Sequence, residues 1–193
     1  MENSLQMRTE ATYSLKFLVY LQNIFLNQNQ SKEEFKFPYI PIKYIFQEDF
    51  EMCFKKLWDE VSQRNSEHPM NDLKIFNEDK DLFYKRLFKE SNDNLKDYNE
   101  IYQSYKIWWD SFAGRFSVER SIADTEQKLY MELANSLIQK EIATQKELNI
   151  SLIYDECLLV NLDVSSYFAI LSTKDFFVKY KEMVPKLLKH LLN

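Results

Sequence analysis

Glycine is almost absent from this sequence, since Gly114 is the only one among 193 residues. Phosphate-binding loops, dinucleotide-binding fingerprints and the nucleophile elbow of hydrolases each need two or more glycines at fixed spacing, because only glycine permits such sharp turns and close backbone approach. The sequence therefore contains none of these three motifs. Tight β-hairpins also favour glycine in their turns, so its scarcity argues against a many-stranded all-β fold.

Cysteine and histidine are also scarce, with two of each. Cys53 and Cys157 lie far apart and match no Cys-x-x-Cys pattern, which predicts two reduced, buried thiols rather than a disulfide. His68 and His190 belong to no cluster of metal-ligating residues, so neither a zinc site nor a ferritin-like di-iron site is expected. We therefore expect no metal and no cofactor, and we assign no catalytic residue.

Long hydrophobic runs and strong positive charge are missing as well. The longest apolar run near the N-terminus has only five residues, from Phe17 to Leu21, which is too short for a signal peptide or a membrane span. We expect a cytoplasmic protein with no membrane partner. The formal net charge of -5 disfavours nucleic acid as a partner, because sequence-independent binding needs clustered Lys and Arg.

Hydrophobic residues make up 45% of the chain and recur mainly at three- and four-residue steps, which is typical of amphipathic helices in globular proteins. We predict a mostly all-α protein, a single helical domain over residues 1–193 that forms a bundle of about six to seven helices. The helices are expected at residues 4–27, 47–64, 78–90, 95–113, 117–148, 150–162 and 172–191. Residues 150–162 also alternate in part like a strand.

An extended connector is expected at residues 35–46. Pro38 and Pro41 remove amide donors there and bias the residues before them towards extended backbone. We expect this segment to pack on the core, and a short edge strand is the alternative. Any sheet is therefore expected within residues 35–46 or 150–162.

Three helix boundaries follow from local signals. Gly114 is predicted at the left-handed position that ends helix 95–113. Ser172 and Asp175 have the spacing of a capping box that opens the last helix. Pro185 removes one backbone hydrogen bond, which predicts a kink or a restart in that helix.

Carboxylates are the only plentiful reactive groups, but they form no recognised metal motif. Helical nucleotide pyrophosphohydrolases bind magnesium through a Glu-Glu-x-x-Glu pattern, and Glu33-Glu34 begins such a pattern with Phe37 in place of the third glutamate. Acidic residues in the first turn of a helix also complement the helix dipole without any catalytic role. Catalysis by carboxylates on helices is therefore the minority interpretation.

Aromatic residues are the most informative positive feature, with 15 Phe, 12 Tyr and 3 Trp. In helix 95–113, Trp109 falls on the apolar stripe and Trp108 projects about 100° away from it. Either this helix is buried on two sides, or Trp108 marks a binding surface, since Trp and Tyr often anchor interfaces. The candidate protein-binding residues are Trp108, Tyr105, Arg115 and Arg120.

These observations favour a protein-binding role over an enzyme. The predicted function is a cytosolic module that acts on another protein as an inhibitor, immunity-type or regulatory protein. The alternative is a helical small-molecule sensor or a magnesium-dependent nucleotide hydrolase that uses carboxylates on its helices.

Overall fold

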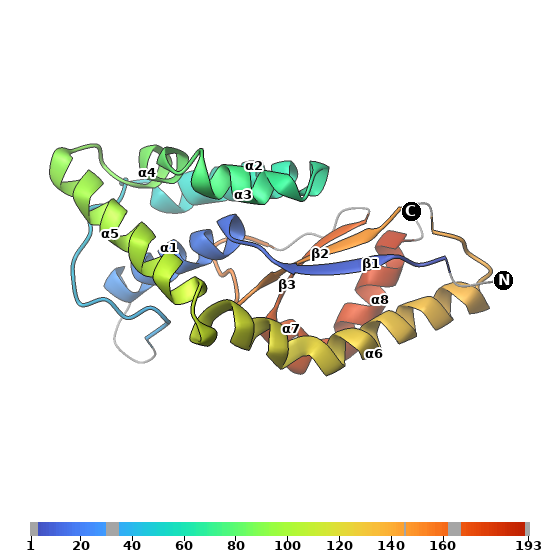
Figure 1. The fold of residues 1–193 in the computed structure, drawn as a ribbon. Helices are drawn as coiled ribbons and strands as arrows, with labels where there is room; N and C mark the ends of the chain where they lie inside the picture. The colour runs from blue at the N-terminus through green and yellow to red at the C-terminus, as the bar shows by residue number, and fades with distance from the viewer. Residues whose placement is uncertain (1–3, 30–34, 145, 162–166, 192–193) are drawn as a thin grey trace. The chain divides into compact units, whose positions relative to one another are not determined.

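The computed structural model describes residues 4–29, 35–144, 146–161 and 167–191 (Figure 1). Helices account for 63% of the described residues, which confirms that helix exceeds half of the chain in this part. The predicted all-α bundle is wrong, because three strands form a parallel sheet in the order β1-β2-β3. The fold is mixed α/β.

Contacts within the chain divide it into two compact units. Unit 1 contains residues 1–11, 112–156 and 161–193, and unit 2 contains residues 12–111 and 157–160. Each unit is described by itself below. A single domain over residues 1–193 stays a prediction.

Unit 1 contains the sheet, which consists of β1 (Met7–Ala11), β2 (Leu148–Ile153) and β3 (Phe168–Ser172). The central strand β2 pairs with β1 through Thr9 and Ile150, and with β3 through Ile150 and Ala169. Two helix predictions are therefore wrong. Residues 150–153 form a strand, and the helix predicted to begin at residue 4 begins only at Ser14.

The position of the sheet differs from the expectation, since β1 and β3 lie outside residues 35–46 and 150–162. The physical reason is that parallel strands are joined by long connections rather than by tight hairpins. The connection between β1 and β2 contains six α-helices and needs no hairpin glycine. The scarcity of glycine therefore argued against β-hairpins, but it did not exclude a parallel sheet.

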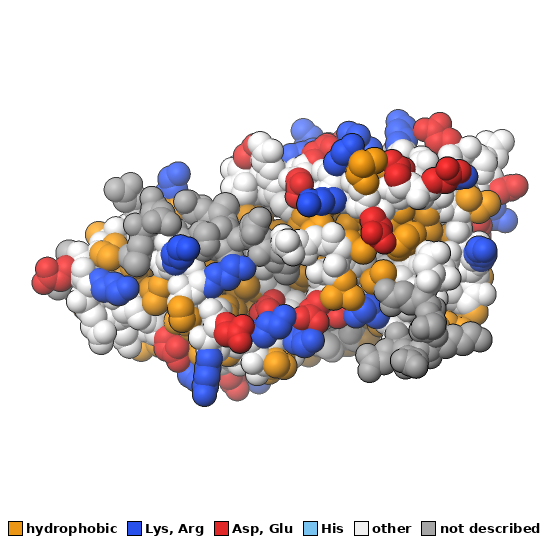
Figure 2. Space-filling model, turned by 180° about the vertical axis from the view of Figure 1, so that it is seen from behind, with side chains coloured by type: hydrophobic (Ala, Val, Ile, Leu, Met, Phe, Trp, Pro, Cys, Tyr) orange, Lys and Arg blue, Asp and Glu red, His pale blue; other side chains and the backbone are white. Residues whose placement is uncertain are grey.

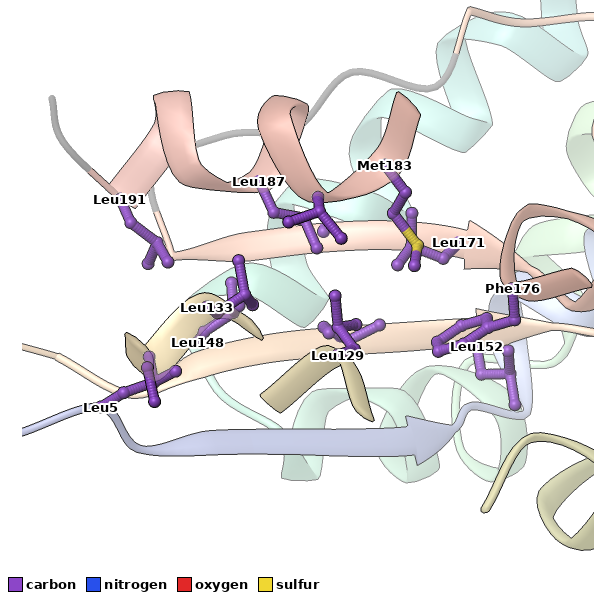
Figure 3. Close-up of a cluster of buried hydrophobic side chains, with 14 of the residues drawn as sticks. Leu5, Leu129, Leu133, Leu148, Leu152, Leu171, Phe176, Met183, Leu187 and Leu191 are labelled. Carbon is purple, nitrogen blue, oxygen red and sulfur yellow. The ribbon is translucent and has the colours of Figure 1, made fainter. Parts of the chain in front are cut away.

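One face of the sheet is covered by α6 (Ser117–Gln139), α7 (Thr173–Phe177) and α8 (Tyr180–Leu191). Figure 3 shows leucines of the helices pointing towards leucines of the strands. The labelled members of this core are Leu5, Leu129, Leu133, Leu148, Leu152, Leu171, Phe176, Met183, Leu187 and Leu191. Each fully buried side chain of this size contributes about 1.5 to 3 kcal/mol.

The end of α6 explains why the predicted helix 117–148 is too long. Glu141 adopts a left-handed conformation with φ of 55°. Its N–H donates to the carbonyl of Ile138, and the N–H of Ile142 donates to the carbonyl of Leu137, both at 3.0 Å. These two bonds form a Schellman motif, which closes the helix at Gln139.

Gly114 does not take the predicted left-handed position. It lies in η1 (Phe112–Phe116), a π-helical turn, with φ of -93° and ψ of -110°. Residues with a side chain avoid this combination, which accounts for glycine at this buried position. The preceding helix already ends at Trp109.

The capping box at the start of α7 is confirmed. The hydroxyl of Ser172 accepts from the N–H of Asp175, and the Asp175 carboxylate accepts from the N–H of Ser172 at 2.7 Å. The helix ends at Phe177 and a new one begins at Tyr180, so the restart occurs before Pro185, which lies inside α8.

Unit 2 consists of α1 (Ser14–Asn29), α2 (Phe50–Glu67), α3 (Met70–Asn77), α4 (Asp81–Leu87) and α5 (Asn92–Trp109). α4 lies within the helix predicted at 78–90 and is shorter, and α3 is a helix that was not predicted. From Ser14 to Ile24 every residue of α1 is buried. This helix is therefore the core of unit 2.

The connector at residues 35–46 is irregular, as predicted, apart from one isolated bridge between Phe46 and Phe88. Its main chain is held by Asn27 of α1. The Asn27 amide donates to the carbonyls of Lys36 at 2.7 Å and Pro38 at 3.0 Å, and its oxygen accepts from the N–H of Lys36 at 2.8 Å.

Asn23 adds a second bond of the same kind, donating to the carbonyl of Phe37 at 2.7 Å. We call Asn23 and Asn27 the amide clamp. Because these side chains replace the hydrogen bonds of a regular element, the connector keeps its irregular path without a partner strand.

We expect Asn27→Ala to lower the free energy of unfolding by about 1 to 3 kcal/mol, because three connector groups lose their partner. Urea denaturation followed by circular dichroism measures this change. Asn99→Ala is the matched control, since the Asn99 amide is exposed and bonds Leu95 within its own helix; its effect should stay within about 0.5 kcal/mol. Equal effects of the two variants would contradict the clamp.

Candidate protein-interaction surface

The candidate surface is built on α5, whose first turn is capped by Ser91. The Ser91 hydroxyl accepts from the N–H of Asn94 at 3.1 Å. The inward side of the helix is a stripe of buried residues: Tyr98, Ile101, Tyr102, Tyr105 and Trp109. Trp109 lies on this buried stripe, as predicted, so α5 presents one face to the core of unit 2.

The buried tyrosines keep their hydroxyl protons and use them as donors. Tyr102 donates to the carbonyl of Phe76 and Tyr105 to that of Tyr13, both at 3.0 Å. Burial, with a smaller contribution from neighbouring Tyr102, raises the pKa of Tyr98. These bonds anchor α5 to α3 and to the start of α1.

A fully buried lysine lies under the same helix. The Lys16 ammonium lies 3.7 Å from the centroid of the Trp109 ring, and both side chains have no exposed surface. Such a cation over an indole ring is attracted by the negative face of the ring. The burial of Lys16 could not be predicted from the sequence, because it depends on the other helices that surround α1.

The side chain of Trp108 is partly buried, so α5 is not fully covered on this side. Its ring stacks on Tyr20 at 6.1 Å and contacts Phe37 of the connector at 4.8 Å. Tyr20 beneath it is buried, and this burial is the main reason that its pKa rises to about 12. Trp108 is therefore held by Tyr20 and Phe37 and keeps part of its surface exposed.

The connector adds three exposed rings next to Trp108. Phe35, Phe37 and Tyr39 are 47%, 48% and 57% exposed, and Pro38 between them is buried. The main chain bends at Phe37 and Pro38. The rings of Phe35 and Tyr39 lie 4.4 Å apart. We call Phe35, Phe37, Tyr39 and Trp108 the connector patch.

The connector half of this patch was not predicted from the sequence. The segment was expected to pack on the core, whereas the amide clamp holds its main chain and leaves the side chains of Phe35, Phe37 and Tyr39 exposed. The carbonyls of residues 36–38 are already bonded. A partner would thus contact side chains here rather than add a strand to the connector.

The structure places the predicted site residues in different units. Tyr105 is fully buried in unit 2, where it supports Trp108 at 5.9 Å. Arg115 and Arg120 belong to unit 1 and are exposed, and Arg115 forms an ion pair with Glu119 at 2.8 Å.

Two exposed phenylalanines accompany these arginines in unit 1. Phe112 and Phe116 are 80% and 56% exposed, and their rings lie 5.2 Å apart. The helix predicted at 95–113 ends already at Trp109, so Phe112 lies in the kinked turn η1 that follows.

Glu33 and Glu34, named for the alternative function, lie outside the described residues. Four other carboxylates are engaged with cations. Ion pairs join Asp79 to Arg64 at 2.6 Å, Glu48 to Lys89 at 2.8 Å, Glu60 to Arg86 at 3.4 Å, and Glu156 to both Lys174 and Lys179 at 2.7 Å. Hydrogen bonds from Lys174 and Lys179 lower the pKa of Glu156. Within the described ranges, no three His, Cys, Asp or Glu side chains gather as a metal site would require.

The cysteines and histidines are few, and those that the structure describes make local structural contacts. Cys157 is buried and forms no disulfide with Cys53, as predicted, and its thiol donates to Gln22 at 3.3 Å. Cys53 is only partly buried. His68 is exposed and accepts from the N–H of Met70 at 3.1 Å. The side chain of His190 lies outside the described part of the chain.

Comparisons with family models, with curated proteins and with solved structures found no match to this chain. Across the described residues, no helix has both the length and the apolar character needed to cross a membrane. Figure 2 shows hydrophobic side chains that reach the surface between charged ones. A function for this chain is therefore inferred from the residues on its own surface.

Proposed function

We propose that this chain is a protein-binding module and that its partner contacts the connector patch. The observation that carries this proposal is the gathering of three half-exposed rings beside the partly exposed Trp108. Trp and Tyr provide large, rigid contact areas and are enriched among the residues that dominate binding energy. Clustered exposed apolar side chains of this kind mark interaction sites more often than scattered ones.

The supporting structure beneath the patch agrees with a binding role. Tyr20 and Tyr105 hold the inner face of Trp108, and the amide clamp holds the connector, so little side-chain entropy remains to be lost on binding. The activity we propose is that of an inhibitor, immunity-type or regulatory protein that acts by contact. Two free thiols agree with a reducing compartment such as the cytoplasm.

The test uses affinity capture of a partner by the purified chain, followed by titration calorimetry with the partner that is identified. We expect Trp108→Ala to weaken binding by about 30-fold or more, equivalent to about 2 kcal/mol, while costing only about 1 to 2 kcal/mol of unfolding free energy. Phe37→Ala should weaken the same complex, because the two rings are in contact.

Ile107→Ala is the matched control for this experiment. Ile107 is the neighbour of Trp108 on α5 and is 72% exposed, so its truncation removes exposed apolar surface outside the connector patch. The control should bind with unchanged affinity. A complex that survives Trp108→Ala and Phe37→Ala would overturn the proposal.

A further inference from the structure

The first strand of the sheet in unit 1 has an outer edge without a partner strand. In the described part of the chain the strand order is β1-β2-β3, so β1 pairs with β2 alone. The N–H of Leu148 donates to the carbonyl of Gln6 at 2.8 Å, so the main chain of Gln6 points towards β2. Main-chain groups alternate in direction along a strand, and those of Met7, Thr9 and Ala11 therefore point away from β2.

The opposite edge of the sheet, on β3, is already engaged. The N–H of Asn149 donates to the carbonyl of Tyr167 at 2.9 Å, so by the same alternation the main chain of Ser172 points outward. The N–H of Ser172 is taken by the Asp175 carboxylate at 2.7 Å. Among the described residues, no hydrogen bond reaches the outward main-chain groups of β1. An unpaired edge of this kind accepts a further strand.

The side chains of β1 alternate between the two faces of the sheet. Met7 packs on the core of unit 1, which is on the face covered by helices. Arg8 and Glu10 lie on the other face, where they form an ion pair with each other and are 48% and 39% exposed. The strand thus has one positive and one negative side chain at equal distances on either side of Thr9.

We propose that β1 pairs antiparallel with β1 of a second copy of this chain, centred on Thr9. In this register Arg8 of each copy lies opposite Glu10 of the other, so opposite charges are neighbours both along and across the strands. A parallel, in-register pairing would instead place like charges side by side. A two-fold axis at Thr9 also makes the contact closed and self-complementary.

The main-chain groups fit the same register. The outward N–H and C=O of Thr9 face those of Thr9 in the second copy, and Met7 faces Ala11, as in the hydrogen-bonded pairs of an antiparallel ladder. The two sheets would then continue into one. Because β1 has only five residues, we expect a weak dimer with a dissociation constant on the order of 10 μM. This inference goes beyond the proposed protein partner and uses a different surface.

Sedimentation equilibrium of the full chain, from about 1 μM to about 300 μM, tests the inference, and we expect a monomer that becomes a dimer as concentration rises. Thr9→Pro should weaken the dimer about 30-fold or more, because proline lacks the N–H that faces the second copy. The single chain should keep its circular dichroism spectrum, since proline is tolerated where the N–H of an edge strand points outward. Thr9→Val is the matched control, and it should dimerise as before because it keeps the N–H.

A charge exchange tests the register itself. Arg8→Glu and Glu10→Arg should each weaken self-association about tenfold, because each change places like charges opposite one another. An equal mixture of these two variants should form a mixed dimer, since every pair across the strands again joins opposite charges. The double variant Arg8→Glu/Glu10→Arg should dimerise by itself for the same reason.

Three results would overturn the inference. The first is a chain that stays monomeric over the whole range of concentration, including one whose edge instead takes a strand from another protein. The second is a dimer that Thr9→Pro leaves intact or that Trp108→Ala abolishes, because that dimer would use another surface. The third is a mixture of Arg8→Glu and Glu10→Arg that associates no better than either variant alone.

Discussion

Trp109→Ala should lower the free energy of unfolding by about 3 to 5 kcal/mol, the largest loss expected for a single substitution in unit 2. The indole has no exposed surface and stacks on Tyr105. It also covers the buried Lys16 ammonium at 3.7 Å. Truncation would leave a cavity and would also remove the aromatic ring that covers the Lys16 ammonium. Loss of the cation–π contact therefore adds to the cost of the cavity.

Urea denaturation followed by circular dichroism measures this loss. Trp108→Ala is the matched control, because it removes the same side chain one residue away from a partly exposed site; about 1 to 2 kcal/mol is expected. The loss of unfolding free energy for Trp109→Phe should fall between the losses for these two variants, because Phe keeps an aromatic ring near Lys16. Similar losses for Trp108→Ala and Trp109→Ala would mean that both faces of α5 are core and would also remove the basis of the connector patch.

Asp72→Ala should cost about 3 kcal/mol of unfolding free energy. The carboxylate of this buried residue accepts from the N–H groups of Tyr13 at 2.7 Å and Ser14 at 2.8 Å, and from the Ser14 hydroxyl. It thereby caps α1 from a different helix. The first turn of α1 has no acidic residue of its own, so Asp72 also supplies the negative charge that the helix dipole favours there.

Asp93→Ala provides the comparison, because Asp93 is an exposed acidic residue in the first turn of α5. Its loss should cost no more than about 1 kcal/mol, in line with a solvated charge near a helix end. The loss of unfolding free energy for Asp72→Asn should lie between those for Asp72→Ala and Asp93→Ala, because Asn keeps one acceptor oxygen but not the charge. If Asp72→Ala and Asp93→Ala destabilise equally in urea denaturation, the capping role of Asp72 is wrong.

Features of this protein that depend on neighbours in sequence were predicted from the sequence. The periodic stripe of α2, with Phe54, Leu57 and Val61, places its side chains on one side whatever the helix packs against. The capping box of Ser172 and Asp175 is equally local, because both of its hydrogen bonds join residues three apart.

Features that depend on distant segments were not predicted. The sequence Met-Arg-Thr-Glu-Ala of β1 has little strand propensity, and it becomes a strand because Thr9 and its neighbours find partners in β2. Those partners lie more than a hundred residues away. Pairing of this kind depends on the tertiary fold, which is why an all-α bundle was expected.

The same division holds for the candidate surface. The sequence alone determined that Trp109 lies on the apolar stripe of its helix and that Trp108 does not, because helical geometry sets the angle between consecutive residues. Only the tertiary structure decided that Phe35, Phe37 and Tyr39 face outward beside Trp108, because the amide clamp from α1 holds the connector main chain in place. Local periodicity follows from backbone geometry, whereas exposure depends on which segments cover a residue, and those segments come from elsewhere in the chain.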